Sequence, residues 1–548
     1  MALSLTVMCN RGVKAVLDRT RYKGIHNKRG ISRFRISAAE FGNNSTSRVD
    51  VMSDNIRLRY PGFVLFLSRL ISVGTGLIFS LIVVRNVSVE EFGIYGNMGD
   101  TVSYFTFLST VIPFWAMRFV ARRHAGSSKT GLMANLILSV ISAVLYLLLL
   151  PLIMEGLKIP KGYTLVYAFL SLQIIEAYAY SAFTFILRAR RPQVVGYGFL
   201  IFEICKVILV LVFIPILHMG LLGAVLSVVF ARLLEFTLYL KLMADDLRER
   251  VVWSYVREWV KASFVNVYNI AGQWIISFAP ILLFMYSGGY ARAYYGAALT
   301  ITNIIGYSSL LAFSLYPRLL SQSNSSDVTA SLRTVLMFAI PMTFGAITLS
   351  GSYLIILKPD YVVAKPILIL LALSAFCITL SNVFHAVVAG TEQFDAEAKI
   401  PVKKLVRSRL FLLFTVPHVR GIALVSLTYI TLSFMAGTPY EAAFLLAAVN
   451  VVASIVTMLM KYAIARRGLP FSMPWGGIAK YLLSSVVMAL VLYVIPPPSR
   501  LSLTLAVTLL GGVIYFSILW FIDEEARRLS RSMFRIASQM VRGRGPTL

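Results

Sequence analysis

The sequence predicts an all-α polytopic membrane protein with about fourteen transmembrane helices, and three observations support this fold class. Hydrophobic residues make up 58% of the 548 residues and charged residues only 14%, with a mean hydropathy of +0.77. This balance excludes a soluble globular protein, in which about a quarter of the residues are charged. Apolar runs of about 20 residues, the length that spans a bilayer, recur along the chain. Lysine and arginine cluster in alternate connections between these runs, which is the pattern of cytosolic loops.

The apolar runs divide the chain into two bundles of six spans and one extra pair. We expect the first bundle in residues 59–257, the second in 258–467 and the extra pair in 468–522, with a basic cytosolic tail in 523–548. The expected spans are residues 60–84, 92–118, 131–153, 162–187, 194–217, 221–243, 259–286, 291–316, 330–357, 363–388, 409–435, 439–463, 478–495 and 501–521.

Residues 1–58 differ from the rest of the chain because they are basic and polar and contain no long apolar run. A signal peptide needs an apolar core of about 7–15 residues, which this segment lacks. Its composition predicts a disordered cytosolic tail. Two alternatives stay open. One is a transit peptide, which Asp18, Glu40 and Asp50 disfavour, and the other is an over-extended gene start with Met52 as the true first residue.

The distribution of Lys and Arg predicts the orientation in the membrane. The longer alternate connections hold 23 of these residues, Lys461 among them, whereas the short connections hold seven, Arg292 among them. Positively charged loops stay in the cytosol, so we expect both termini there, an even number of spans, and a place in the cell membrane. The net charge of +28 is dispersed over these clusters and forms no nucleic-acid patch. The outer connections are too short to hold a catalytic domain, which argues against an enzyme.

Two segments about 200 residues apart resemble each other. EFGIYG at residues 91–96 and AYYGAA at residues 293–298 each precede a proline and an arginine by about 20 residues. Both expected bundles begin in the cytosol, so the repeat is parallel and its axis lies along the membrane normal. Transporter halves related in this way enclose a substrate site near the bilayer midplane and rock around it.

The first expected hairpin carries two charges near the middle of the membrane. Arg69 shares one helix face with Ser72 and other small residues, and Asp100 lies on the returning arm. At 1.5 Å per residue, each lies about 12–13 Å from the start of its arm. A charge at this depth is costly unless it is paired or faces water, so it indicates a functional site. Two hypotheses stay open: Arg69 binds a substrate phosphate, or Arg69 and Asp100 form a structural ion pair.

Four other charged residues in the first bundle form two local pairs. Glu203 and Lys206 are three residues apart, as are Arg232 and Glu235. Residues at this spacing are neighbours on one helix face, so each pair can neutralise itself inside the membrane. We therefore expect a structural role for both pairs.

Glu176 is a mid-span carboxylate without a charged partner in its own helix. Tyr178 and Tyr180 are close enough in the sequence to form hydrogen bonds with it. Desolvation of a buried carboxylate favours its protonated form. Glu176 and Asp100 are therefore candidates for coupling transport to an H⁺ or Na⁺ gradient. The alternative is a protonated glutamate that only packs in the bundle.

The seventh and eighth expected spans carry polar stripes. Asn266, Asn269 and Gln273 lie on one face of the seventh span, and Asn303 and Tyr307 are one turn apart on the eighth. These side chains are expected either to line a hydrophilic cavity between the bundles or to form hydrogen bonds between helices.

Pro417, His418 and Arg420 interrupt the eleventh expected span. Proline kinks a helix and frees a carbonyl, and broken helices mark many transporter sites. The alternative is that residues 403–418 form an interfacial helix and the span starts later. Arginine keeps its charge and binds two phosphate oxygens at once, so a cavity with Arg69 and Arg420 would favour an anionic head group. No metal or cofactor motif occurs, and Cys9, Cys205 and Cys377 form no CxxC.

Several segments together resemble the Wzx-type polysaccharide flippases of the MOP superfamily (multidrug, oligosaccharide-lipid and polysaccharide exporters). They are SRLISVGTGLIFSLIVVRNVSVEEFGIYG in the first hairpin, ILRARRPQ after the fourth span, YYGAALTI…LYPRLL in the eighth and AGTEQFDAEAK after the tenth. The resemblance covers about residues 60–520. It implies a V-shaped pair of bundles, alternating access and functional charges on cavity-facing helices, a position that Arg69, Asp100 and Arg420 match. It also implies that the extra pair of spans accommodates a lipid tail. The chain departs from the family in lacking a dense arginine cluster.

The leading hypothesis is therefore a monomeric flippase that moves a polyprenyl-phosphate or -diphosphate glycan outward through the lipid bilayer, without a cofactor. The runner-up is a cation-coupled multidrug exporter of the same fold. A membrane-embedded glycosyltransferase would need an outer catalytic loop, which the sequence lacks. A purely structural scaffold would tolerate the loss of every charge inside the membrane.

Overall fold

The computed structural model describes residues 68, 71–312, 315, 316, 319, 324–391 and 408–528. These residues all belong to one compact unit, Leu58–Leu548, and the regular elements they form are helices. The tail expected in residues 1–58 and most of the tail expected in 523–548 lie outside the described residues, as does Arg69.

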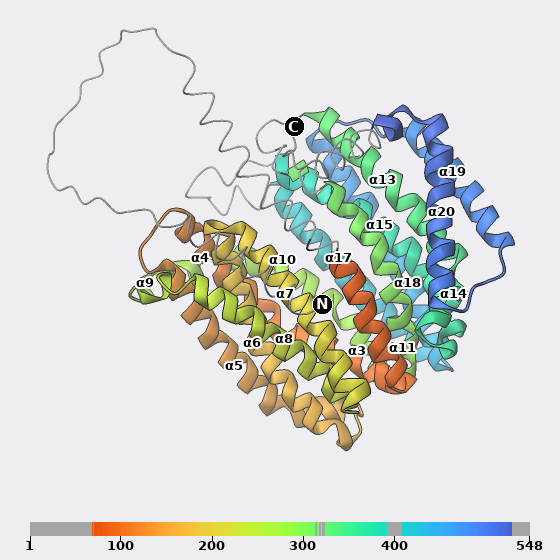
Figure 1. The fold of residues 1–548 in the computed structure, drawn as a ribbon. Helices are drawn as coiled ribbons and strands as arrows, with labels where there is room; N and C mark the ends of the chain where they lie inside the picture. Colours follow the sequence, from red (N-terminus) through yellow and green to blue (C-terminus); the bar gives the residue numbers. More distant parts are fainter. Residues whose placement is uncertain are drawn as a thin grey trace, which may run out of the picture. The chain divides into compact units, whose positions relative to one another are not determined.

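The N-terminal half consists of the helix Ile71–Asn86 and the helices α3 to α8 (Figure 1). A capping box between Ser88 and Glu91 starts α3, and Pro192 at the first position starts α7. The elements are α3 (Val89–Thr106), η1 (Phe107–Thr110), α4 (Val111–Ala121), α5 (Ser127–Gly156), η2 (Lys161–Tyr163), α6 (Thr164–Arg190), α7 (Pro192–Leu211), η3 (Val212–Ile216) and α8 (Gly220–Leu242).

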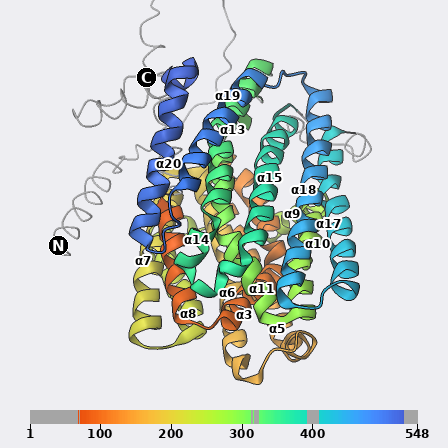
Figure 2. The ribbon, with the colours of Figure 1, turned by 90° about the vertical axis from the view of Figure 1, so that its right-hand side faces the viewer.

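The short helix α9 (Trp253–Ala262), preceded by η4 (Asp246–Arg248), links this half to the C-terminal half, which runs from α10 to α18. Its elements are α10 (Phe264–Ile276), α11 (Phe278–Gly306), η5 (Tyr307–Ala312), α13 (Ser325–Thr348), α14 (Ser350–Leu357), η6 (Pro359–Ala364), α15 (Lys365–Thr391), α17 (Arg409–Phe434) and α18 (Pro439–Gly468). The extra pair, α19 (Trp475–Val494) and α20 (Leu501–Ile522), packs on α13 at the edge of this half (Figure 2).

The fold class predicted from the sequence is confirmed. Twelve helices among the described residues are long and apolar enough to cross a membrane. One of them, Asn266–Ala312, holds two expected spans, which are separated at Gly288 by a left-handed, non-helical conformation (φ 72°). Glycine adopts this conformation without steric cost, so the expected connection 287–290 is a break of one residue. The helix Ile71–Asn86 is shorter than a full span, and the total of fourteen stays a prediction.

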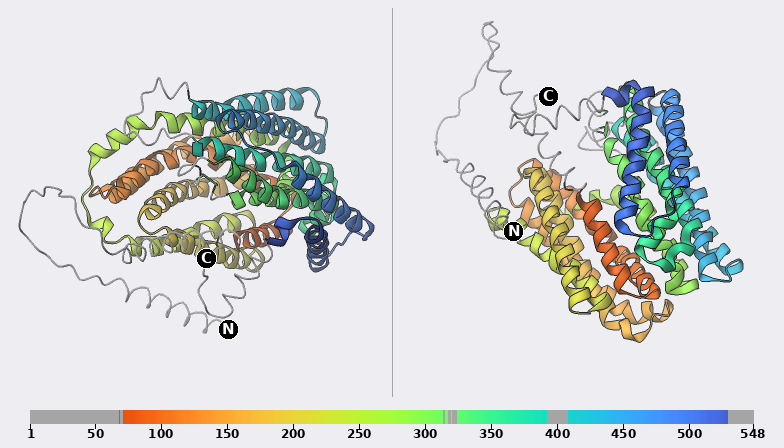
Figure 3. Two further views of the ribbon diagram at one scale, coloured as in Figure 1. Left: turned by 90° about the horizontal axis from the view of Figure 1, so that it is seen from above. Right: turned by 45° about the vertical axis from the view of Figure 1, so that its right-hand side comes forward.

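The two halves pack against each other where α3 lies along α11 (Figure 3). One apolar cluster crosses this contact, with Ile94 and Met98 on one side and Ala293 and Ala297 on the other. The helices approach so closely that a Cβ atom on Gly93 would overlap the backbone of Gly289. Interiors are packed without spare volume, so this contact requires glycine at position 93.

Beside this contact, each half donates a cationic side chain to a backbone carbonyl of the other half. Arg85 donates from Nη2 and Nε to the carbonyl oxygen of Ile356, at 2.7 and 3.1 Å. Lys358 donates from Nζ to the carbonyl oxygen of Val87, at 3.0 Å. In both cases the accepting carbonyl lies at or next to the C-terminal end of a helix, where a positive charge is favourable.

We predict that Gly93→Ala destabilises the protein by about 3 kcal/mol or more, because the added methyl group forces α3 and α11 apart. The measurement is the thermal unfolding midpoint of the purified protein. Gly99→Ala on the same helix is the control, since its Cβ would meet no atom within 4 Å. Equal midpoints for the two variants would show that a methyl group at position 93 fits between α3 and α11.

Candidate functional site

An ion pair between the halves lies at the centre of the α3–α11 contact. Arg292 Nε donates to Asp100 Oδ2 at 2.6 Å, and Arg292 Nη2 donates to Asp100 Oδ1 at 3.1 Å. The side chains are 8% and 17% exposed, so this is a two-pronged, largely desolvated pair. Glycines make room for it: a Cβ atom on Gly96 or Gly296 would lie 2.9 Å from the guanidinium group.

The structure gives Asp100 a partner that the sequence reasoning missed, whereas a pairing of Asp100 with Arg69 stays a prediction because Arg69 lies outside the described residues. The observed partner, Arg292, belongs to the other half and had been assigned from the sequence to a short outer connection. α11 is helical at Arg292, four residues beyond the break at Gly288, so the arginine lies at the start of the eighth expected span, residues 291–316. Gly96 and Gly296, the glycines that make room for the guanidinium, belong to the two repeated motifs of the sequence, and that signal could have pointed to a close contact here.

A polar cavity of about 300 Å³ lies next to this ion pair, between the two halves. Gly99, Asp100 and Ser103 of α3 form one wall. The other walls come from the C-terminal half and include Tyr295 of α11, Arg420 and Leu424 of α17, and Leu446 and Asn450 of α18. Asp100 and Arg420, two of the residues predicted to bind substrate, therefore line the same cavity.

Arg420 is held in this cavity by neutral groups. Its Nη2 donates to Asn450 Oδ1 at 3.0 Å and to Ser454 Oγ at 3.2 Å, and Asn450 Nδ2 donates to the hydroxyl oxygen of Tyr295 at 3.2 Å. Its Nε is buried without a hydrogen-bond partner. No carboxylate of the described residues pairs with Arg420, so the guanidinium keeps an unneutralised charge and a free donor for an anionic ligand.

The helix that carries Arg420 continues through Pro417. α17 is one helix of 26 residues and one of the twelve candidate spans. This favours the span over the interfacial helix as the interpretation of this segment. His418 stacks on Tyr268 of α10 with ring centroids 4.2 Å apart, so it packs between α10 and α17 and does not line the cavity.

The other predicted cavity residues do not line this cavity. Asn266 is partly buried and its Nδ2 has no hydrogen-bond partner, whereas Gln273, Asn303 and Tyr307 are exposed. Asn269 is partly buried, and Ser72 lies near the start of the helix Ile71–Asn86. A substrate-binding role for all these residues stays a prediction.

The N-terminal half holds a separate network of buried charges. Both predicted local pairs are confirmed: Lys206 Nζ lies 2.9 Å from Glu203 Oε2, and Arg232 pairs with Glu235. Arg232 also lies over the ring of Phe202, 3.6 Å from its centroid. The pairs therefore neutralise themselves as expected.

Glu176 is the third carboxylate near these pairs. It is 8% exposed, and its Oε2 has no hydrogen-bond partner. The expected bond with Tyr178 is wrong, since that hydroxyl donates to the carbonyl oxygen of Phe105 at 3.1 Å on another side of α6. Among the described residues, these three carboxylates and two cations leave one negative charge in excess, which a bound proton or cation would neutralise. Coupling through Glu176 stays a prediction.

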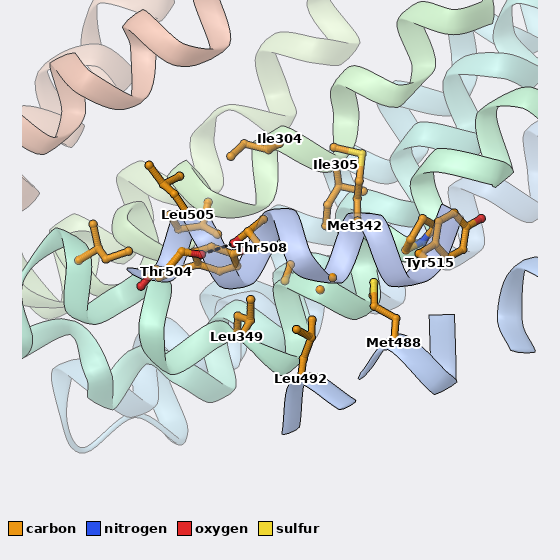
Figure 4. Close-up of a pocket in the computed structure, with 18 of the residues that line it drawn as sticks. Ile304, Ile305, Met342, Leu349, Met488, Leu492, Thr504, Leu505, Thr508 and Tyr515 are labelled. Atoms are coloured by element: carbon orange, nitrogen blue, oxygen red, sulfur yellow. Dashed lines mark hydrogen bonds between the residues drawn. The ribbon is translucent and has the colours of Figure 1, made fainter. Parts of the chain in front are cut away.

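An apolar groove of about 320 Å³ lies beside α20 (Figure 4). Apolar side chains from several helices point into it, namely Ile304, Ile305, Met342, Leu349, Met488, Leu492 and Leu505. Leu77 of the helix Ile71–Asn86 adds to the lining. The few polar groups are already used within the protein: Tyr353 and Thr508 share a hydrogen bond of 2.9 Å, and Tyr515 donates to the carbonyl oxygen of Met337. The groove can thus accept an alkyl chain.

Metal ligands do not cluster in this structure. No three His, Cys, Asp or Glu side chains among the described residues come close enough to hold a metal ion. Cys205 and Cys377 are free thiols.

Comparison with known proteins shows the fold. No protein-family model matches the sequence, and no curated protein matches it. The lipid II flippase MurJ in its inward closed conformation matches with a TM-score of 0.62 and 16% identity, over 84% of this chain and 99% of that chain. An inward-facing multidrug resistance MATE family transporter of the MOP superfamily matches with a TM-score of 0.53 and 13% identity, over 72% of this chain and 95% of that chain. A mutant of the Vibrio cholerae MATE transporter VcmN matches with a TM-score of 0.52 and 12% identity, over 77% of this chain and 98% of that chain. The chain is a multi-pass membrane protein with the fold of these MOP-superfamily structures.

We predict that Asp100→Ala and Arg292→Ala each destabilise the protein by about 3–5 kcal/mol, because each leaves the other charge buried without its partner. The double variant should be more stable than either single variant, since it strands no charge. The measurement is a double-mutant cycle on the unfolding midpoint. The exposed pair Asp245–Arg248 is the control and should give no coupling. Additive effects at Asp100 and Arg292 would contradict the ion pair.

Proposed function

We propose that this protein is a flippase that moves a lipid-linked oligosaccharide, a polyprenyl-phosphate or -diphosphate glycan, outward across the cell membrane by alternating access. In this role it binds and moves its substrate without chemical change, so it is not an enzyme. Both termini face the cytosol, the protein acts as a monomer, and the substrate and the surrounding lipids are its partners.

One observation carries this proposal: a single helix, α11, joins a polar cavity with a free arginine to an apolar groove. Tyr295 of α11 lines the cavity, and Ile301, Ile304 and Ile305 line the groove. These positions are six to ten residues apart, or about 9–15 Å along the helix axis. A molecule with an anionic head and a long hydrocarbon chain matches this arrangement, whereas a compact cationic drug uses neither the arginine nor the groove.

Arg420 and the Asp100–Arg292 pair suit the phosphate groups of such a substrate. Arg420 offers an unneutralised guanidinium inside the cavity. Phosphate competes for arginine through the same two-pronged geometry that Asp100 uses. Arrival of the head group would then weaken the bond between the halves, which supports a transport cycle in which substrate binding prepares the opening of the α3–α11 contact. The likeness to MurJ is consistent with this assignment.

The second candidate is a cation-coupled exporter of small molecules. It is favoured by the buried carboxylates Glu176, Glu203 and Glu235, which carry one more charge than the cations beside them. It is also consistent with the likeness to MATE transporters. Coupling to H⁺ or Na⁺ through Glu176 is compatible with either function, so the transported substrate decides between them.

We predict that the protein, reconstituted in liposomes, translocates a polyprenyl-diphosphate oligosaccharide and that Arg420→Ala lowers the rate at least tenfold. Removing Arg420 deletes the free cation of the cavity. Arg420→Lys should recover only part of the rate because a point charge replaces a two-pronged donor. The measurement is the fraction of the glycan that becomes accessible to a glycosidase on the far side of the membrane.

The control is Arg466→Ala, which removes an exposed arginine from the last turn of α18 and should leave the rate unchanged. Parental translocation by Arg420→Ala would exclude the head-group role of Arg420. No translocation of any polyprenyl-linked glycan, together with gradient-driven export of a cationic dye, would establish the second candidate.

A further inference from the structure

Lys461 is a buried cation that the proposed transport cycle does not use. The sequence places it in a cytosolic connection, but in the structure it lies inside α18 and is 8% exposed. It makes no salt bridge and no hydrogen bond with the described residues. Lysine is almost never buried in this way unless a counter-charge accompanies it.

The register of two neighbouring helices shows what surrounds Lys461. α15 and α18 pack along their lengths, with Ser374 and Ser454 in contact at 2.8 Å and the rings of Phe384 and Tyr462 5.3 Å apart. The two contacts have nearly the same sequence offset, so the helices run parallel. Ser381, seven residues after Ser374, therefore lies level with Lys461, which comes seven residues after Ser454.

Ser381 and His385 complete the surroundings of Lys461. The hydroxyl of Ser381 is buried and has no hydrogen-bond partner. His385 comes one turn later on the same face of α15. The three side chains thus bring one ammonium group, one free hydroxyl donor and one imidazole to the same level of the bundle.

No acidic side chain of the described C-terminal half compensates this charge. The carboxylates on the described elements from α10 to α18 are Asp327, Asp360 and Glu441, and each lies within three residues of the start of its helix. Arg420, which donates to Ser454 two turns before Lys461 on α18, is a second cation of this half without a carboxylate partner among the described residues. Within the part of the chain that the structure describes, the interior of this half therefore carries cations without matching anions.

A buried ammonium without a counter-charge is unfavourable in a low-dielectric interior, and a bound anion would remove that penalty. We propose that Lys461, Ser381 and His385 form a binding site for a small inorganic anion, a halide or phosphate, between α15 and α18. The ammonium group supplies the charge, and the Ser381 hydroxyl supplies a directed hydrogen bond. The site lies two helical turns from Ser454, which accepts a hydrogen bond from the cavity residue Arg420, and it does not rest on the proposed transport of a lipid-linked glycan.

The test is the thermal midpoint of the full chain in nanodiscs of zwitterionic lipid, measured in gluconate buffer with added chloride or phosphate. Ligands that bind only the folded state raise the midpoint with the logarithm of their concentration above Kd. The parent protein should show this rise with at least one of the two anions, and the more effective anion identifies the natural one. Lys461→Met should lose most of the rise and be no less stable than the parent in gluconate alone.

Lys461→Arg keeps the charge and should keep the anion-dependent rise of the thermal midpoint. Ser381→Ala should reduce this rise several-fold, although the charge of Lys461 stays in place. The control is Lys241→Met, which removes an exposed lysine from the last turn of α8 and should leave the rise unchanged. If neither anion changed the thermal midpoint of the parent protein, the proposal would be overturned, because Lys461 would then be buried as a neutral amine. A full rise in Lys461→Met and Ser381→Ala would overturn it as well, since the anion would bind elsewhere.

Discussion

The two-pronged ion pair between Asp100 and Arg292 is the interaction on which the contact between the two halves depends. A desolvated pair of this kind is stable only when both partners are in place and well aligned, because either charge alone is costly in the membrane. The alignment requires the close approach of α3 and α11, which in turn requires Gly93 and Gly96 on one helix and Gly289 and Gly296 on the other. The bonds from Arg85 and Lys358 to carbonyls of the opposite half reinforce the same contact.

The buried charges of the two halves differ in sign. In the N-terminal half, Glu203 and Glu235 are matched by Lys206 and Arg232, and Glu176 is left in excess. In the described C-terminal half, Arg420 and Lys461 have no carboxylate partners. Among the described residues, the buried charges of the N-terminal half are therefore negative in excess and those of the C-terminal half are positive in excess. Within the same described part of the chain, the Asp100–Arg292 pair is the salt bridge that joins the two halves.

Much of this architecture could be predicted from the sequence because the bilayer imposes a length and a composition on every span. The expected connection 287–290 and the local pairs at Glu203 and Arg232 follow from spacing along one chain segment, and the structure confirms them. The partner of Asp100 could not be predicted in this way, since it comes from a helix about 190 residues away and depends on tertiary packing. Lys461 was misplaced for a related reason: a lysine near a helix end is expected to reach the aqueous boundary, and only the packing of α15 shows that it is buried.

Sequence spacing also overestimated local contacts. Tyr178 follows Glu176 by two residues, and residues at that interval do not share a helix face, so its hydroxyl bonds to the carbonyl of Phe105 instead. Neutral residues of the cavity, such as Tyr295 and Asn450, give no charge signal in the sequence and became apparent only from their bonds around Arg420.

In the proposed transport cycle, the halves must separate at the α3–α11 contact. The most direct measurement is transport by the double variant Arg85→Cys with Ile356→Cys, at two positions that are now joined across the halves by the bond from the Arg85 guanidinium to the backbone carbonyl of Ile356. After cross-linking with a short bifunctional thiol reagent, we expect translocation of the polyprenyl-linked glycan to stop and reduction of the cross-link to restore it. The two single variants, treated in the same way, should keep their activity. Undiminished translocation by fully cross-linked protein would contradict the account.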